Sequence, residues 1–165
     1  MKYLPFENII FKTKLNSKEI SKRLNEITEP KSFFRIPVFF RDHQQYEGVI
    51  GDNIFTINRI INYRNSFLPI IKGTIQEGHQ KTKIFIQMRP HLVAIIFMLI
   101  WFGVSILICT SIFITMLFEA NFTALAAIPF GILILSYVII LGGYNYESNK
   151  SIKYLAKLFE AEIIH

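Results

Sequence analysis

Between Leu92 and Phe118 the sequence contains no aspartate, glutamate, lysine, arginine or histidine. After Glu119, a second uncharged run extends to Tyr146. A helix of 27 residues is about 40 Å long, which exceeds the ~30 Å hydrocarbon core of a bilayer. Seventeen of those 27 residues are Leu, Ile, Val or Phe, and each favours insertion by about 0.3–0.6 kcal/mol at mid-helix. Since a chain this small cannot bury two such helices in a soluble core, both runs are predicted to cross a membrane.

The signatures of catalysis are absent as well. The single cysteine, Cys109, excludes an internal disulfide, and we interpret it as a small apolar packing residue. No histidine pair at metal-ligand spacing, Cys-x-x-Cys, glycine-rich phosphate loop or nucleophile elbow occurs. The two runs also lack the ionisable groups on which proton relays depend. We therefore expect a non-enzymatic protein with no catalytic residues, no metal site and no cofactor.

Basic residues are confined to the two ends of the chain. Fifteen of the 18 lysines and arginines precede Leu92, and the other three follow Tyr146. Residues 1–11 lack the apolar core of a signal peptide. By the positive-inside rule, both termini are then cytoplasmic and residues 119–123 form an external turn. The predicted location is the cell membrane, with two spans.

The segment before the first run has the pattern of a small α+β domain. Residues 8–13 read as a strand, and residues 17–28 as an amphipathic helix with Asn16 as its N-cap and Glu19 completing a capping box. Beyond Pro30 the hydrophobic period changes to two, which predicts an antiparallel meander of four or five strands. The strand candidates are residues 33–40, 46–50, 54–61, 67–75 and 82–88.

The C-terminal segment predicts a cover for this sheet. Apolar residues recur on one helical face and lysines on the other, so residues 147–165 are expected to form a cytoplasmic amphipathic helix that packs on the sheet or lies on lipid. The predicted fold class is α+β: a small antiparallel sheet with an N-terminal helix, interrupted by a transmembrane helical hairpin and closed by a C-terminal amphipathic helix. The predicted divisions are residues 1–91, 92–118, 119–123, 124–146 and 147–165.

Residues 59–69 form the most distinctive polar segment. Arg59 and Arg64 are spaced to clamp a phosphate or carboxylate, with Tyr63 and Asn65 beside them. Alternatively, the segment is a loop whose side chains satisfy its own backbone. Both interpretations stay open, so Arg59, Tyr63, Arg64 and Asn65 are the candidate ligand-binding residues.

This segment also carries a resemblance. The motif runs from Tyr46-Glu-Gly48 through Asn53-x-Phe55-x-Ile57-x-Arg59-Ile-Ile61 and Tyr63-Arg-Asn-Ser-Phe-Leu-Pro69 to Ile71-x-Gly73. It resembles a family of small uncharacterised bacterial membrane proteins that share an N-terminal α+β portion, a helical hairpin and a short terminal helix. The likeness covers nearly the whole chain, and its most specific part is Tyr63–Pro69. It implies a bacterial inner-membrane location and no particular activity.

Two functional hypotheses follow. Residues 1–91 carry fifteen positive and eight negative side chains, a net charge of +7, but the positives are scattered, so we do not expect a nucleic-acid partner. The first hypothesis is a non-enzymatic integral membrane protein that presents a small cytoplasmic α+β domain for binding or assembly. Its expected partners are the lipid bilayer and either further copies of the chain or other membrane subunits. The alternative is a receptor for an anionic small ligand or lipid headgroup, which uses the Arg59–Asn65 loop.

Overall fold

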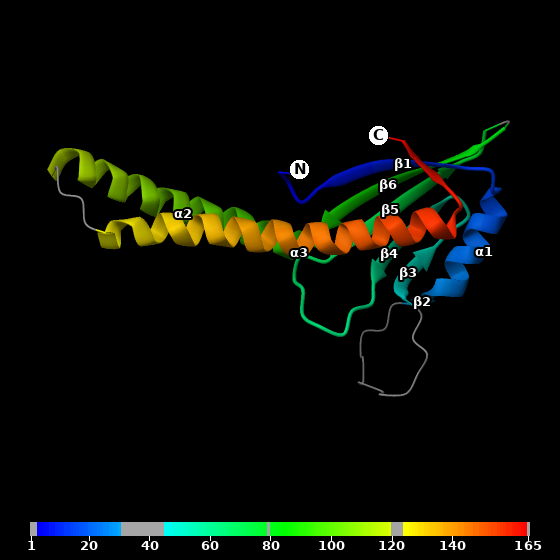
Figure 1. Cartoon of the computed structure of the whole chain (residues 1–165). Helices are drawn as coiled ribbons and strands as arrows, with labels where there is room; N and C mark the ends of the chain where they lie inside the picture. The colour runs from blue at the N-terminus through cyan, green and yellow to red at the C-terminus, as the bar shows by residue number, and fades with distance from the viewer. Residues whose placement is uncertain (1–2, 31–44, 79, 120–123, 165) are drawn as a thin grey trace.

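The structure is a computed structural model that describes residues 3–30, 45–78, 80–119 and 124–164. Over these residues the chain forms a seven-stranded sheet and three α-helices. The two longest helices project from the sheet as a hairpin, and the two chain ends lie together at the sheet (Figure 1). The α+β class predicted from the sequence is confirmed. The strand candidate at residues 33–40 lies outside the described residues.

The sheet is built around the predicted meander. Its strand order is β2-β3-β4-β5-β6-β1-β7, with β2 and β3 parallel and every other neighbouring pair antiparallel. Strands β3 to β6 follow one another along the chain and across the sheet, as the sequence predicted, whereas the short edge strands β2 and β7 were not predicted. The bounds are β1 Glu7–Thr13, β2 Thr28–Pro30, β3 Tyr46–Ile50, β4 Ile54–Arg59, β5 Pro69–Gln76, β6 Thr82–Pro90 and β7 Glu162–Ile164.

The first helix begins where its cap predicts. In α1 (Ser17–Ile27), the Asn16 side chain accepts a hydrogen bond of 2.8 Å from the backbone N–H of Glu19. This bond satisfies one of the N–H groups that a helix start leaves without an intrahelical partner. Ile20 and Leu24 are fully buried, so the helix is amphipathic as its spacing predicted, and its apolar face packs into the core beside the sheet.

The third helix differs from the expectation. The sequence predicts a span at residues 124–146 and a separate helix at 147–165, whereas α3 is one helix, Ile128–Leu158, preceded by the short 3₁₀ turn η1 (Ala124–Ala127). No proline or glycine interrupts the sequence between residues 144 and 158, so nothing breaks the hydrogen-bond ladder where the charges begin. The chain turns only after Leu158, where Glu160 has a positive φ of 48°. Residues 162–164 then pair with β1 rather than continue a helix.

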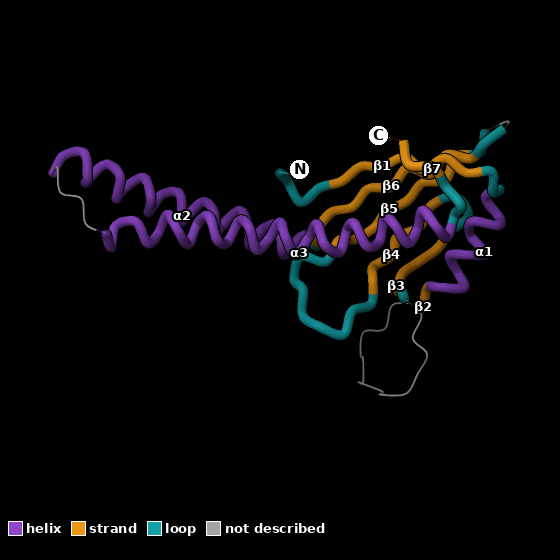
Figure 2. Tube along the Cα trace, viewed as in Figure 1, coloured by secondary structure: helices purple, strands orange, loops and turns teal. Residues whose placement is uncertain are grey.

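The core lies between one sheet face and the helices α1 and α3. The C-terminal half of α3 crosses the sheet (Figure 2), so the C-terminal segment packs on the sheet, the first of the two predicted alternatives. Two side chains bind the C-terminal end of α3. Thr13 Oγ1 donates a 2.6 Å hydrogen bond to the Phe159 carbonyl, and Arg23 Nη1 donates one of 2.6 Å to the Leu158 carbonyl. The fully buried side chains include Phe11, Ile20, Leu24, Ile57, Ile71, Ile84, Tyr144, Leu155 and Phe159.

Two glycines are required by close packing. A Cβ atom on Gly48 would lie 2.1 Å from the carbonyl oxygen of Thr56 on the neighbouring strand. A Cβ atom on Gly73 would lie 2.0 Å from the ring of Phe55, its cross-strand partner. Both glycines belong to the motif that runs from Tyr46 to Gly73, and in the structure neither position has room for a larger side chain.

The hairpin consists of α2 (Leu92–Glu119) and the first part of α3. Both helices are long and apolar enough to cross a membrane, by length and composition. In their most apolar windows only 17% and 6% of the residues are buried, unlike the core helix of a soluble protein. The two helices touch through the rings of Phe102 and Tyr137, whose centroids lie 6.4 Å apart.

Candidate functional site

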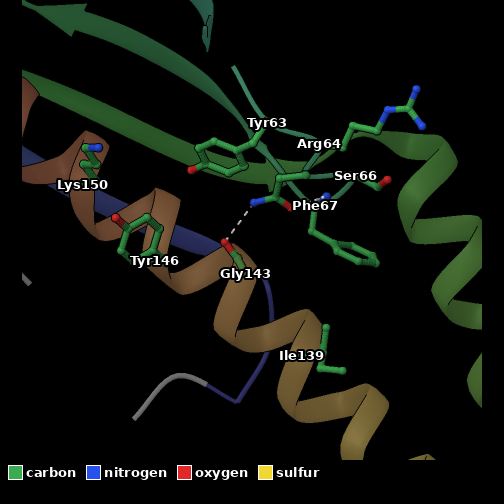
Figure 3. A pocket seen from close by; sticks show the side chains of 9 residues that line it. Tyr63, Arg64, Ser66, Phe67, Ile139, Gly143, Tyr146 and Lys150 are labelled. Atoms are coloured by element: carbon green, nitrogen blue, oxygen red, sulfur yellow. Dashed lines mark hydrogen bonds between the residues drawn. The ribbon is translucent and has the colours of Figure 1, made fainter. Parts of the chain in front are cut away.

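The loop that connects β4 to β5 lies beside α3, at the point where that helix meets the sheet (Figure 2). Between loop and helix is an open groove of about 540 Å³. Figure 3 shows it from close by, with side chains entering from both sides. It is lined by Tyr63, Arg64, Asn65, Ser66, Phe67, Ile139, Gly143, Tyr146 and Lys150.

Behind this groove a carboxylate is buried in the sheet–helix contact. Glu147 of α3 is completely inaccessible to solvent. Arg59 Nη1 donates a 2.8 Å hydrogen bond to its Oε2, and the side chain of Arg59 is 16% exposed. The Tyr63 hydroxyl donates a hydrogen bond to Oε1 of the same carboxylate. A buried charge requires such partners, so both carboxylate oxygens are satisfied from the β4–β5 segment.

These contacts give three of the four predicted ligand residues a structural role. Arg59 and Tyr63 hold Glu147, and Arg59 does not line the groove. Asn65 Nδ2 donates to the Gly143 carbonyl at 3.2 Å, while its Oδ1 accepts from the Phe67 N–H at 3.0 Å. This is the pattern of a loop that satisfies its own backbone and docks on a helix.

Arg64 is the exception. Its guanidinium makes no hydrogen bond or ion pair within the described residues. It points away from Tyr146 and Lys150, on the far side of the groove (Figure 3). The structure therefore brings Tyr63, Arg64 and Asn65 to one groove, but it does not form the clamp of two arginines that the sequence suggested.

The tyrosines beside Glu147 are held in their neutral form. Burial raises the pKa of Tyr46 to about 12, and the neighbouring Ser151 and Arg59 only partly offset that effect. The hydrogen bond to Glu147 raises the pKa of Tyr63 to about 12. Both phenols therefore stay protonated well above neutral pH, and the Tyr63 hydroxyl remains a hydrogen-bond donor to Glu147.

Glu147 is not among the site residues that the sequence predicts, although the sequence contains a signal for it. The predicted apolar face of the C-terminal helix includes Ile152 and Leu155. Residues four apart share one face of a helix. Ser148 therefore lies on the same face as Ile152, and Glu147 and Ser151 lie on the same face as Leu155. The buried face thus continues toward the N-terminus of the helix with polar residues. Ser148 donates a hydrogen bond to the buried carboxylate of Glu7 on β1. A polar buried face of this kind indicates a specific contact with the sheet.

The described residues contain no group of three or more His, Cys, Asp or Glu side chains that could hold a metal ion. No protein-family model matches the chain, and no curated protein or solved structure is significantly similar to it. The resemblance to small bacterial membrane proteins therefore stays a prediction.

Proposed function

We propose that the chain is a non-enzymatic integral membrane protein of the inner membrane, which presents its α+β domain on the cytoplasmic side for binding or assembly. The observation that carries the proposal is the continuity of α3. One helix extends from the apolar hairpin into the core of the sheet domain, so the domain is fixed to the anchor rather than tethered by a linker.

Two further observations support this reading. The hairpin exposes large apolar side chains along its length, including Leu99, Ile100, Leu107 and Leu135, and a surface of this kind is stable in lipid but not in water. Strand β1 near one chain end pairs with β7 near the other. A shared sheet supports the placement of both ends on the same side of a bilayer.

Insertion and topology can be tested by cysteine labelling in intact cells. Cys109→Ser provides a cysteine-free background, into which Lys22→Cys on α1 or Phe118→Cys at the far end of α2 is introduced. Both positions are exposed, Phe118 at 86%. A membrane-impermeant maleimide should label Phe118→Cys in intact cells, and Lys22→Cys only after permeabilisation. Release of the chain by alkaline carbonate, or early labelling of Lys22→Cys, would contradict the proposal.

The binding or assembly role needs a separate measurement. The mass of the particle after extraction in a mild detergent, measured by light scattering, should exceed that of one 19.3 kDa chain plus detergent. A strictly monomeric particle without a co-purifying partner would count against assembly and leave the membrane location intact.

The groove beside the β4–β5 loop favours a second candidate, a receptor for an anionic small ligand. It is open to solvent, and its lining includes two cationic side chains on opposite sides, Arg64 from the loop and Lys150 from α3 (Figure 3). Arg64→Ala with Lys150→Ala should abolish retention of an anionic ligand and leave the melting temperature unchanged, since neither residue holds Glu147. Unchanged retention would remove this candidate.

A further inference from the structure

A second groove, of about 290 Å³, lies where β6 leads into α2. The β5 and β6 residues that line this groove alternate along the strands with buried residues such as Ile71 and Met88. Successive side chains of a strand point to opposite faces, so the groove is on the sheet face opposite α1 and α3. It is separate from the groove beside the β4–β5 loop. Its walls include Ile70 and Lys72 from β5, Gln87 and Arg89 from β6, and Leu92 and Ile95 from α2.

One half of this groove is cationic. Arg89 pairs with Ile70 and Gln87 pairs with Lys72 across the two strands, so Lys72 and Arg89 are diagonal neighbours on one face, about 7–8 Å apart between Cα atoms. None of the described residues that line the groove is acidic. Within the described parts of the chain neither cation has a hydrogen-bond or ion-pair partner. In contrast to Arg59, both remain able to bind an anion from outside.

The other half is apolar and belongs to the candidate membrane span. Leu92 is the first residue of α2 and is 66% exposed, and Ile95 follows one turn later. Arg89 precedes Leu92 by three residues, so the cations lie where the chain would enter the hydrocarbon. A phospholipid presents the same two chemistries side by side, a phosphate at the surface and acyl chains below it.

We infer that this groove binds the phosphate of an anionic phospholipid headgroup. Arg89 and Lys72 supply the positive charge, Gln87 supplies a neutral donor, and an acyl chain lies against Leu92 and Ile95. The inference rests on the proposed membrane insertion of α2. A free phosphate ion would make no use of the apolar half, which is why the occupant is a lipid.

The test is lipid retention by the full-length chain in a neutral detergent. Phosphatidylglycerol is titrated against phosphatidylcholine, and bound lipid is counted by native mass spectrometry. The variant is Lys72→Gln with Arg89→Gln. The matched control is Lys12→Gln with Lys83→Gln, a cross-strand pair on the same sheet face. Lys83 is six residues from Arg89 on β6, about 20 Å along the strand and beyond the screening length of about 8–10 Å.

A well-placed cation strengthens binding to an anionic lipid about fivefold, so the Lys72/Arg89 variant should bind phosphatidylglycerol about 25-fold more weakly. The Lys12/Lys83 control should change binding by less than about twofold. The charge-conserving variant Lys72→Arg with Arg89→Lys should retain most of the lipid. Phosphatidylcholine binding should be the same in all four proteins.

Three results would overturn the inference. If the Lys72/Arg89 and Lys12/Lys83 glutamine variants weaken binding equally, the lipid responds only to the net charge of the protein and not to this groove. If Arg64→Gln causes the loss instead, the headgroup binds beside the β4–β5 loop. If inorganic phosphate binds as tightly as phosphatidylglycerol, the groove recognises the free ion. Carbonate extraction and cysteine labelling report insertion independently, so a failure of the membrane proposal is distinguishable from a failure of the lipid site.

Discussion

Glu147 and Arg59 form an ion pair whose two partners differ in solvent exposure, so substituting one or the other should change the stability by different amounts. Glu147 is fully buried, whereas the side chain of Arg59 retains 16% of its accessible surface. Removing Arg59 leaves the Glu147 carboxylate buried without a cationic partner and out of reach of water. Removing the charge of Glu147 leaves an arginine that can move toward solvent. The two single substitutions should therefore differ in cost, although they break the same ion pair.

The magnitudes follow from the burial of the group left behind. Arg59→Met leaves the Glu147 carboxylate with only the Tyr63 hydroxyl, and breaking a buried pair in this way costs about 3–5 kcal/mol. Glu147→Gln keeps the shape and an acceptor for Tyr63 and loses one charged hydrogen bond, about 1.5–3 kcal/mol. The double variant Arg59→Met with Glu147→Gln has no stranded charge. It should therefore be more stable than Arg59→Met alone.

The assay is thermal unfolding in mild detergent at neutral pH, followed by the near-ultraviolet circular dichroism of the buried tyrosines. For a chain of this length about 1 kcal/mol corresponds to 2–4 °C, so Arg59→Met should lower the midpoint by about 10 °C and Glu147→Gln by about 5 °C. Arg64→Met, which removes an unengaged arginine, should change the free energy of unfolding by less than about 0.5 kcal/mol. Equal costs for the two single variants, or simple additivity in the double variant, would refute the reasoning.

Three further predictions concern packing and protonation. Gly48→Ala should destabilise the domain by about 1–3 kcal/mol, seen as a lower midpoint in the same melt, because its Cβ would overlap the Thr56 carbonyl. Gly103→Ala should leave the midpoint unchanged or raise it, since no atom lies within 4 Å of the added Cβ and alanine favours a helix by about 0.5–1 kcal/mol. Because the pKa of Tyr46 rises from 10.0 to about 12 on folding, the stability it provides is complete below pH 10 and is lost towards pH 12, at about 1.4 kcal/mol per pH unit. Tyr46→Phe should flatten that decline in a series of melts across this pH range.

Much of the fold was readable because its signals are local. The Asn16 cap, the alternation in β6 and the uncharged run at residues 92–118 each depend on near neighbours in sequence, and the structure has the corresponding helix starts and strand. The edge strands β2 and β7 have three residues each. Strands this short carry no periodicity of their own, and they exist because β3 and β1 offer unpaired edges nearby. Long-range pairing of that kind is not encoded in any local window.

The candidate site was only partly predictable for a related reason. Asn65 and Tyr63 were recognised as unusual, but the function of an arginine depends on what stands opposite it. The partner of Arg59 is 88 residues away on α3, and Glu147 looked like the first charge after a span rather than a buried residue. The sequence gives no sign that Lys72 and Arg89 belong together, since each is one cation on a separate alternating strand. Only the pairing of β5 with β6 places them at one groove.

The position of Glu147 has a consequence for how the domain is held. A helix that leaves a membrane through a flexible linker lets its domain rotate, but here α3 enters the core without a break and is fixed at successive turns. Tyr144 donates to the Met88 carbonyl at 2.9 Å, Glu147 binds Arg59, and Ser148 donates to Glu7. These bonds reach β6, β4 and β1, so a tilt of α3 must carry the whole sheet with it. Since α2 begins directly after β6, the hairpin is attached to the sheet at two places, through the β6–α2 connection and through the packing of α3. The sheet face opposite α1 and α3, with its cationic groove, is thereby held in one fixed orientation relative to the hairpin.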